Sequence, residues 1–152
     1  PISIVSDDEA HILRTFFALV DKHILRSNMR RPTFIGHNIA SFDLRFIFQR
    51  AVINRVPVPI WWPRNARPWD DSINDTMLMW AGHGNRISLA NLCDALGIES
   101  DNEIDGSMVS DMVMAGRLQE VADYCADDVR ITRECWRRMT LTAEPEFDED
   151  PF

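Results

Sequence analysis

A short apolar segment between two helical patterns constrains the fold of this chain more than any other feature. Residues 33–36 are bounded by turn-forming residues and are typical of a short buried strand. Apolar residues recur with the helical period on both sides of this segment, and they predict one helix over about residues 7–25 and another over about residues 42–54. Residues 2–5 also have the pattern of a short strand. This order of elements indicates an α/β layer fold.

The rest of the chain is predicted to be mainly helical. Residues 56–71 contain four prolines and three tryptophans, which favours an extended strand and a loop. Helices are predicted to begin near Asp75, after the capping residue Ser88, and over residues 107–115 and about 118–141. We expect the three tryptophans to cover a core or a partner surface, and base stacking is the alternative for Trp61, Trp62 and Trp69.

The length of 152 residues suits a single domain. We expect residues 1–141 to form that domain and residues 142–152, which hold five acids, no base and two prolines, to be a flexible acidic tail. The three cysteines form no Cys-x-x-Cys pair, which favours a reducing, cytoplasmic location. Because no apolar run approaches the ~18 residues of a membrane span, we expect no membrane partner.

The net charge of −8 is unevenly distributed along the sequence. Residues 22–69 contain nine arginine or lysine residues and a single acid, Asp43, so this segment carries +8. Residues 70–152 carry −13. A basic segment of this kind is typical of a phosphate-binding surface, and solvated helix faces are the alternative. Asp43, the lone acid within it, therefore needs an explanation.

The segment from Gly36 to Asp43 places a polar turn and then a carboxylate directly after the predicted strand. In α/β folds, sites form where strands end and helices begin. A carboxylate in the first turn of a helix is also stabilised by the helix macrodipole. Taken alone, Asp43 therefore has an ordinary structural explanation.

Tyr124 and Asp128 form the second polar feature, and Tyr124 is the only tyrosine of the chain. They lie four residues apart on the predicted last helix and therefore share one face. We expect the core to be met by a neighbouring apolar stripe of this helix, made of Leu118, Val121, Ala122, Cys125, Val129, Thr132 and Trp136. Taken alone, the pair is better explained as a solvated acidic turn with a half-buried tyrosine.

Taken together, the two features resemble a pair of nuclease motifs. Asn38, Phe42 and Asp43 follow the predicted strand as Asn-x-x-x-Phe-Asp, and Asp128 lies 85 residues after Asp43 in Tyr-x-x-x-Asp. This pair is similar to the second and third motifs of the DEDD 3′–5′ exonucleases, the DnaQ-like nucleases. The tyrosine marks the tyrosine-type branch of that superfamily.

Other stretches narrow the resemblance. Residues 105–107 together with residues 116–125 are similar to the predicted PolB-like 3′–5′ exonuclease family, and residues 36–51 resemble the proofreading domain of family B DNA polymerases. The resemblance covers roughly residues 6–140. It implies an α/β fold of the RNase H-like type, with a mixed sheet flanked by helices. The implied activity is metal-dependent 3′–5′ hydrolysis of phosphodiester bonds at DNA 3′ ends.

The resemblance also implies roles for individual residues. Asp43 and Asp128 would be ligands of Mg²⁺ or Mn²⁺ in a two-metal site, and hard cations of this kind prefer carboxylate oxygens. Tyr124 would orient the attacking water, because a phenol of pKa ~10 suits positioning better than proton removal. Nucleic-acid contacts are expected from Asn38, Phe42 and Arg45.

The first motif of the superfamily, Asp-x-Glu on an opening strand, has no convincing match in this chain. Asp7, Asp8 and Glu9 match it in letters, but a capping box formed by Ser6 and Glu9 explains them better. We expect the first motif and the opening strands to precede residue 1. Two alternatives therefore stay open, an inactive nucleic-acid-binding pseudo-nuclease and a fragment of a polymerase proofreading domain. Expected partners are single-stranded DNA 3′ ends, with RNA as an alternative, and a polymerase or other replication or repair protein.

Overall fold

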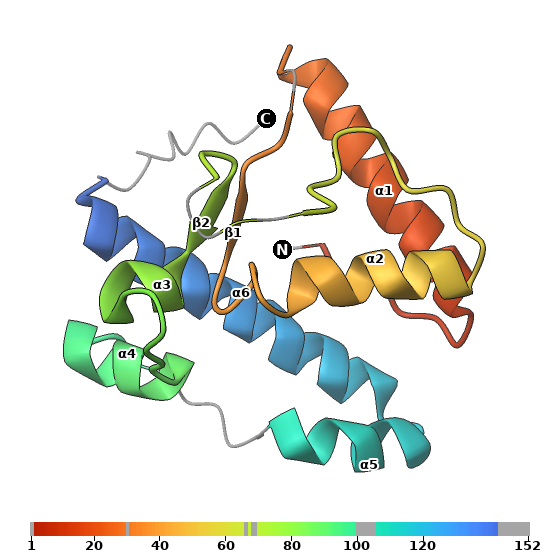
Figure 1. The fold of residues 1–152 in the computed structure, drawn as a ribbon. Coiled ribbons are helices and arrows are strands. Elements are labelled where there is room, and N and C mark those ends of the chain that lie inside the picture. The colour runs from red at the N-terminus through yellow and green to blue at the C-terminus, as the bar shows by residue number, and fades with distance from the viewer. Residues whose placement is uncertain (1, 30, 66, 68–69, 100–105, 143–152) are drawn as a thin grey trace, which may run out of the picture.

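The structure is a computed structural model that describes residues 2–29, 31–65, 67, 70–99 and 106–142 (Figure 1). Trp69 and the predicted acidic tail beyond residue 142 lie outside the described residues. In chain order the elements are α1 (Glu9–Arg26), β1 (Phe34–Gly36), α2 (Asp43–Ile53), β2 (Ile73–Asp75), α3 (Thr76–Ala81), α4 (Leu89–Leu96), a 3-10 turn (Gly106–Met108), α5 (Val109–Met114) and α6 (Leu118–Thr140). The chain is therefore a mixed α/β domain with mostly helices.

A small parallel sheet lies at the centre of this arrangement. β1 pairs with β2 so that Phe34 is opposite Ile73 and Gly36 is opposite Asp75. Because the strands are parallel, both end at the same edge of the sheet. The long helix α6 packs against β1 and is also contacted by α3, α4 and α5 (Figure 1). The two segments that carry the sequence motifs thus meet where the strands end.

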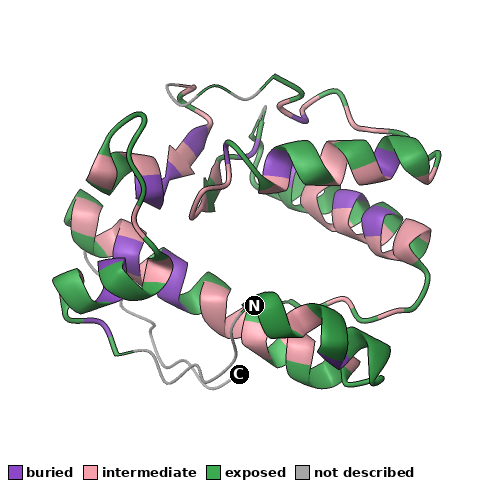
Figure 2. Cartoon of the chain, turned by 60° about the horizontal axis from the view of Figure 1, so that its bottom comes forward, coloured by how far each residue is buried: buried purple, intermediate pink, exposed green. Residues whose placement is uncertain are grey.

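The buried residues form two clusters (Figure 2). The first joins α1, α2 and the loop after α2 through aromatic packing, and in it the rings of Phe17 and Trp62 lie 5.5 Å apart. Trp61 and Trp62 are therefore core residues, as predicted, and Trp61 Nε1 also donates a hydrogen bond to Asp21. The second cluster joins α4 to α6 and is built around Leu92 and Ile131.

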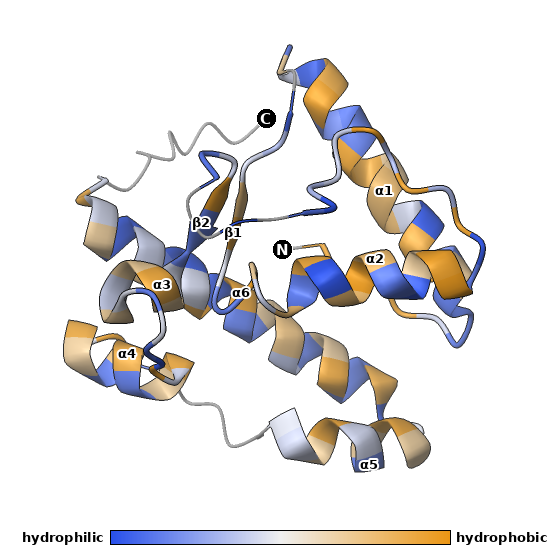
Figure 3. Cartoon of the chain, viewed as in Figure 1, coloured by the Kyte–Doolittle hydropathy of each residue, from blue (hydrophilic) through white to orange (hydrophobic). Residues whose placement is uncertain are grey.

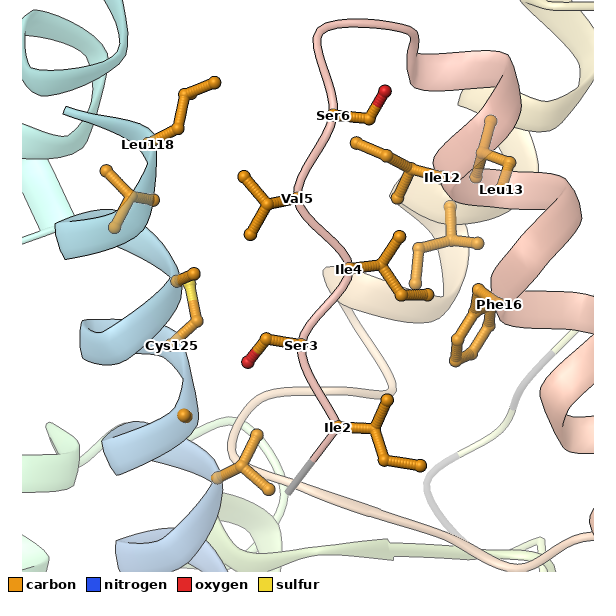
Figure 4. A pocket seen from close by; sticks show the side chains of 15 residues that line it. Ile2, Ser3, Ile4, Val5, Ser6, Ile12, Leu13, Phe16, Leu118 and Cys125 are labelled. Atoms are coloured by element: carbon orange, nitrogen blue, oxygen red, sulfur yellow. The ribbon is translucent and has the colours of Figure 1, made fainter. Parts of the chain in front are cut away.

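The predicted strand over residues 2–5 is absent from the described part of the chain. These residues lie between α6 and α1, and no described strand pairs with them. Figure 4 shows their side chains alternating, with Val5 pointing toward α6 and Ile4 toward Ile12 and Phe16 of α1. The alternating pattern of the sequence is real, but without a hydrogen-bonding partner it gives a coil rather than a strand.

The predicted capping box at Ser6 is also wrong. Asp8 caps α1 by accepting a hydrogen bond from the backbone N–H of His11 at 3.1 Å. Glu9 instead forms a bidentate ion pair with Arg50 of α2 and accepts a hydrogen bond from Asn54. Asp8 therefore starts α1, and Glu9 joins α1 to α2. Neither side chain lines the cavity that holds Asp43, which is described below.

The apolar stripe of α6 does not form the main core contact of that helix. The buried residues of α6 are Ile131, Thr132 and Cys135, and of these only Thr132 belongs to the stripe. Val129, another stripe residue, is 59% exposed. The stripe residues before Val129 line a cavity of about 510 Å³ that also meets residues 2–6 and α1. In Figure 3 hydrophobic residues alternate with hydrophilic ones along the N-terminal half of the helix. None of the described helices has the length and hydropathy needed to cross a bilayer.

We predict that only one of the three thiols reacts rapidly in the folded protein. Cys125 is exposed, whereas Cys93 and Cys135 are buried with their sulfur atoms 3.8 Å apart. Burial raises the pKa of all three thiols, that of Cys135 to about 12, so solvent access rather than pKa alone separates Cys125 from the inner pair. Titration with a thiol reagent should count one group in buffer and three in denaturant. Cys125→Ser should abolish the first count, and two rapid groups in the native protein would contradict the packing of α4 on α6.

Candidate functional site

Asp75, at the end of β2, holds the turn that follows β1. Its side chain is buried, with 3% exposure, and its carboxylate accepts hydrogen bonds from the backbone N–H groups of Asn38 (2.9 Å) and Ala40 (3.1 Å). The same carboxylate caps α3 by accepting from the N–H groups of Met77 and Leu78. The sequence predicted that a helix begins near Asp75 and missed the contact across the sheet edge.

His37 fixes the other side of the same turn. Its Nδ1 lies 3.0 Å from Oγ1 of Thr76, and its Nε2 lies 2.9 Å from the carbonyl oxygen of Ile87. Since a carbonyl oxygen only accepts, Nε2 carries a proton. His37 thus connects the end of β1 to α3 and to the segment before α4.

Two backbone constraints explain the residue types at the start of this turn. A Cβ added to Gly36 would lie 2.7 Å from the Cβ of Ile39, closer than side chains tolerate. Asn38 has φ = 59°, a left-handed conformation that asparagine adopts more easily than most residues. The path of the chain therefore requires the glycine and favours the asparagine, whatever else they contact.

We predict that Asn38→Gly and Asn38→Ala separate the backbone role of Asn38 from its expected contact with nucleic acid. Alanine at a positive φ should lower the free energy of unfolding by about 1 kcal/mol, whereas glycine should leave it unchanged or raise it. Both substitutions remove the side-chain amide and should weaken oligonucleotide binding equally. Urea unfolding and fluorescence anisotropy measure the two effects. Equal destabilisation by the two variants would contradict the turn geometry.

Asp43 and Asp128 line the same cavity of about 570 Å³. Asp43 is the first residue of α2, and Asp128 lies near the middle of α6. The fold therefore places one carboxylate from each of the two sequence motifs in the wall of the same cavity. Burial raises the pKa of Asp43, and the nearby charge of Asp75 raises it further. Apolar side chains, among them Ile35 and Leu89, form much of the remaining wall.

The other predicted site residues lie near this cavity but do not line it. Tyr124 is half-buried one helical turn before Asp128, and its hydroxyl oxygen lies 3.9 Å from the position of a Cβ added to Gly106. Phe42 is 58% exposed and its ring stacks on that of Phe46, with centroids 5.7 Å apart. Arg45 is exposed on α2.

Two residues of the cavity wall were missed as candidate site residues. Trp136 and Arg133 of α6 line the cavity beside Asp128. Within the described part of the chain, the indole N–H of Trp136 is buried and has no hydrogen-bond partner. The sequence analysis assigned Trp136 to the apolar stripe. The signal for a site role was its position eight residues after Asp128, which places the two side chains on the same side of α6.

The donor set of the cavity suits a hard divalent cation. Asp43 and Asp128 both offer carboxylate oxygens, which Mg²⁺ and Mn²⁺ prefer to nitrogen or sulfur. The raised pKa of Asp43 reflects a buried negative charge that a cation would compensate. Among the described residues, no group of three or more His, Cys, Asp or Glu side chains has the geometry of a complete metal site.

Comparison with known proteins gives one family. A family model described as a predicted 3′-5′ exonuclease related to the exonuclease domain of PolB matches residues 2–152. No curated protein and no solved structure gives a significant match. The match spans both strands, all six helices of the described residues and the whole cavity that Asp43 and Asp128 line.

Proposed function

Because this chain belongs to the family of predicted 3′-5′ exonucleases related to the exonuclease domain of PolB, we propose that it hydrolyses phosphodiester bonds at the 3′ ends of single-stranded DNA. The observation that carries the proposal is the placement of Asp43 and Asp128 in one cavity where the parallel strands end. We propose further that the two strands and their helices are part of an RNase H-like fold.

Asp43 and Asp128 would hold Mg²⁺ or Mn²⁺ in this cavity. When bound, such ions activate a water molecule and neutralise charge on the attacked phosphate. The protein contributes the position of the carboxylates, since Asp75 and His37 fix the turn that leads into Asp43. Apolar side chains such as Ile35 and Leu89 form much of the wall, and an apolar surrounding strengthens electrostatic interactions at the site.

The remaining motif residues would contact the strand and the water. Tyr124 would orient the attacking water from the helical turn before Asp128. Phe42 presents an exposed ring, already stacked on Phe46, against which a terminal base can pack. Trp136 adds a second aromatic surface inside the cavity. Asn38 and Arg45 would contact the terminal nucleotides and their phosphates.

A second candidate function is nucleic-acid binding without hydrolysis. It is favoured by the composition of the cavity, whose lining includes two carboxylates, Asp43 and Asp128, as its acidic residues. A site with two protein ligands binds a divalent cation weakly unless another group completes it. We propose that the active form has a polymerase or another replication or repair protein as its partner. We propose that it acts in the cytoplasm.

The direct test is the degradation of a 5′-labelled single-stranded oligonucleotide with Mg²⁺ or Mn²⁺. We expect a ladder that shortens from the 3′ end, is stopped by an inverted 3′-terminal nucleotide, and leaves a circular strand intact. A parallel RNA substrate shows which sugar is accepted. Cleavage of the circle would contradict an exonuclease. Binding of the oligonucleotide without any degradation would favour the second candidate.

A further inference from the structure

The C-terminal half of α6 carries a basic surface that lies outside the basic segment of residues 22–69. With the end of α4 it encloses a cavity of about 510 Å³. Four guanidinium groups and two carboxylates provide its charge, those of Arg130, Arg133, Arg137, Arg138, Glu99 and Glu134. The cavity, which we call the arginine groove, therefore carries a net charge of +2 in a chain of net charge −8.

The wall of the arginine groove is fixed by hydrogen bonds. Arg138 donates to the carbonyl oxygens of Leu96 and Gly97 at the end of α4, and its Nε donates to Glu134 at 3.0 Å. α4 and α6 are also joined by the buried cluster around Ile131. The groove is therefore a formed feature of the fold rather than a chance gathering of mobile side chains.

The helix macrodipole does not explain all of these arginines. Cations are stabilised mainly in the last turn of a helix, and α6 ends at Thr140. Arg133 and Arg130 lie about two and about three turns before that end. Arg130 pairs with Asp127 at 2.9 Å, and Arg133 is exposed to solvent. Arg133 therefore presents a positive charge to whatever occupies the groove.

Arg133 connects the arginine groove to the candidate active site. It lines both the groove and the cavity that contains Asp43 and Asp128. Arg137 follows Asp128 by nine residues, which at 3.6 residues per turn places it about half a turn round α6 from Asp128. Arg133 lies between these two faces, so a strand whose 3′ end enters the cavity can reach the arginine groove by passing Arg133.

We propose that the arginine groove binds the sugar-phosphate backbone of the single strand whose 3′ end lies in the Asp43–Asp128 cavity. The proposal rests on the proposed function, because that function places a 3′ end there. Guanidinium groups are the side chains best suited to phosphate oxygens, and such contacts carry affinity without sequence preference. Because the chain as a whole is acidic and repels phosphates, we expect the strand to bind only along a locally basic surface such as the arginine groove.

Fluorescence anisotropy with labelled oligothymidylates of three to nine nucleotides tests the proposal on the full chain, in EDTA so that no hydrolysis occurs. We expect the wild-type affinity to rise with length. In Arg130→Gln/Arg133→Gln this rise of affinity with length should be lost. For the longest strand, the slope of log K against log [salt] should also become shallower by about 1.4, because each lost phosphate contact on a single strand contributes ~0.7. Arg14→Gln/Arg117→Gln, which removes two exposed charges outside both the arginine groove and the basic segment of residues 22–69, is the matched control and should behave as wild type.

Glu99→Gln gives a test of opposite sign. It removes an exposed carboxylate from the arginine groove and should tighten binding of the long strand several-fold, an effect that misfolding does not produce. Unchanged affinity in both the double arginine variant and Glu99→Gln would overturn the proposal, as would the absence of oligonucleotide binding by wild type. If hydrolysis fails but the arginine and Glu99 effects are present, the groove stands and the exonuclease assignment falls. If hydrolysis occurs and the arginine and Glu99 effects are missing, the exonuclease assignment stands and the proposal for the arginine groove falls.

Discussion

Asp75→Ala is expected to lower the free energy of unfolding by about 3 kcal/mol. The substitution removes a helix cap, which costs about 1 kcal/mol, and leaves buried N–H groups without an acceptor at about 1–3 kcal/mol each. Four backbone N–H groups, two in the turn after β1 and two in α3, depend on this one carboxylate. Because the turn leads directly into Asp43, hydrolysis should fall together with stability.

Asp8→Ala is the matched control for this prediction. Asp8 also caps a helix, but it is exposed and accepts a hydrogen bond from one N–H, that of His11. Its loss should cost about 1 kcal/mol and leave hydrolysis unchanged. Urea unfolding of the two variants beside wild type measures the difference. A loss at Asp75 no greater than that at Asp8 would show that the turn does not depend on the buried carboxylate.

Asp43→Asn is expected to abolish hydrolysis while making the domain more stable at neutral pH. Loss of an outer-shell group typically costs a metal site 10–100-fold, so loss of a direct ligand should reduce the rate by more than about 100-fold. The gain in stability follows from burial, which raises the pKa of Asp43 in the folded protein. At neutral pH the folded protein therefore carries a carboxylate that burial penalises, and the neutral amide of asparagine avoids that penalty.

The sign of this pH effect is determined by the raised pKa. Between the unfolded pKa of Asp43 and its higher folded pKa, the native state holds more protons, so wild-type stability falls as pH rises. Asparagine does not titrate, and the variant should lack this part of the pH dependence. Urea unfolding at pH 3 and pH 7 should show a larger advantage of the variant at pH 7. A variant less stable than wild type at pH 7 would mean that the Asp43 carboxylate is stabilised rather than penalised by its surroundings.

The turn between Gly36 and Asp43 could be predicted because its requirements are local. Gly36 is needed for the approach of Ile39, and Asn38 adopts a positive φ, so both constraints are visible as residue types in a short segment. The helix α4 was likewise marked by its cap Ser88, and α6 by its helical period. The pairing of Asp43 with Asp128 in one cavity followed from the motif pair, since neither residue alone indicated more than a helix surface.

The features that were missed depend on contacts between distant segments. β2 is three residues long and polar at two of them, so only its pairing with β1 makes it a strand. The second function of Asp75 exists because parallel pairing places it opposite Gly36. Residues 2–5 have a strand pattern but no partner in the described residues, and the apolar stripe of α6 faces them rather than a closed core.

The central claim is that Asp43 and Asp128 jointly hold a divalent cation. Titration of Mn²⁺ followed by electron paramagnetic resonance measures this binding without any requirement for turnover. We predict that Asp43→Asn and Asp128→Asn each weaken Mn²⁺ binding at least about tenfold. Asp127→Asn, whose carboxylate pairs with Arg130 and does not line the cavity, should leave it unchanged. Equal Mn²⁺ affinity in wild type and all three variants would show that this cavity is not a metal site.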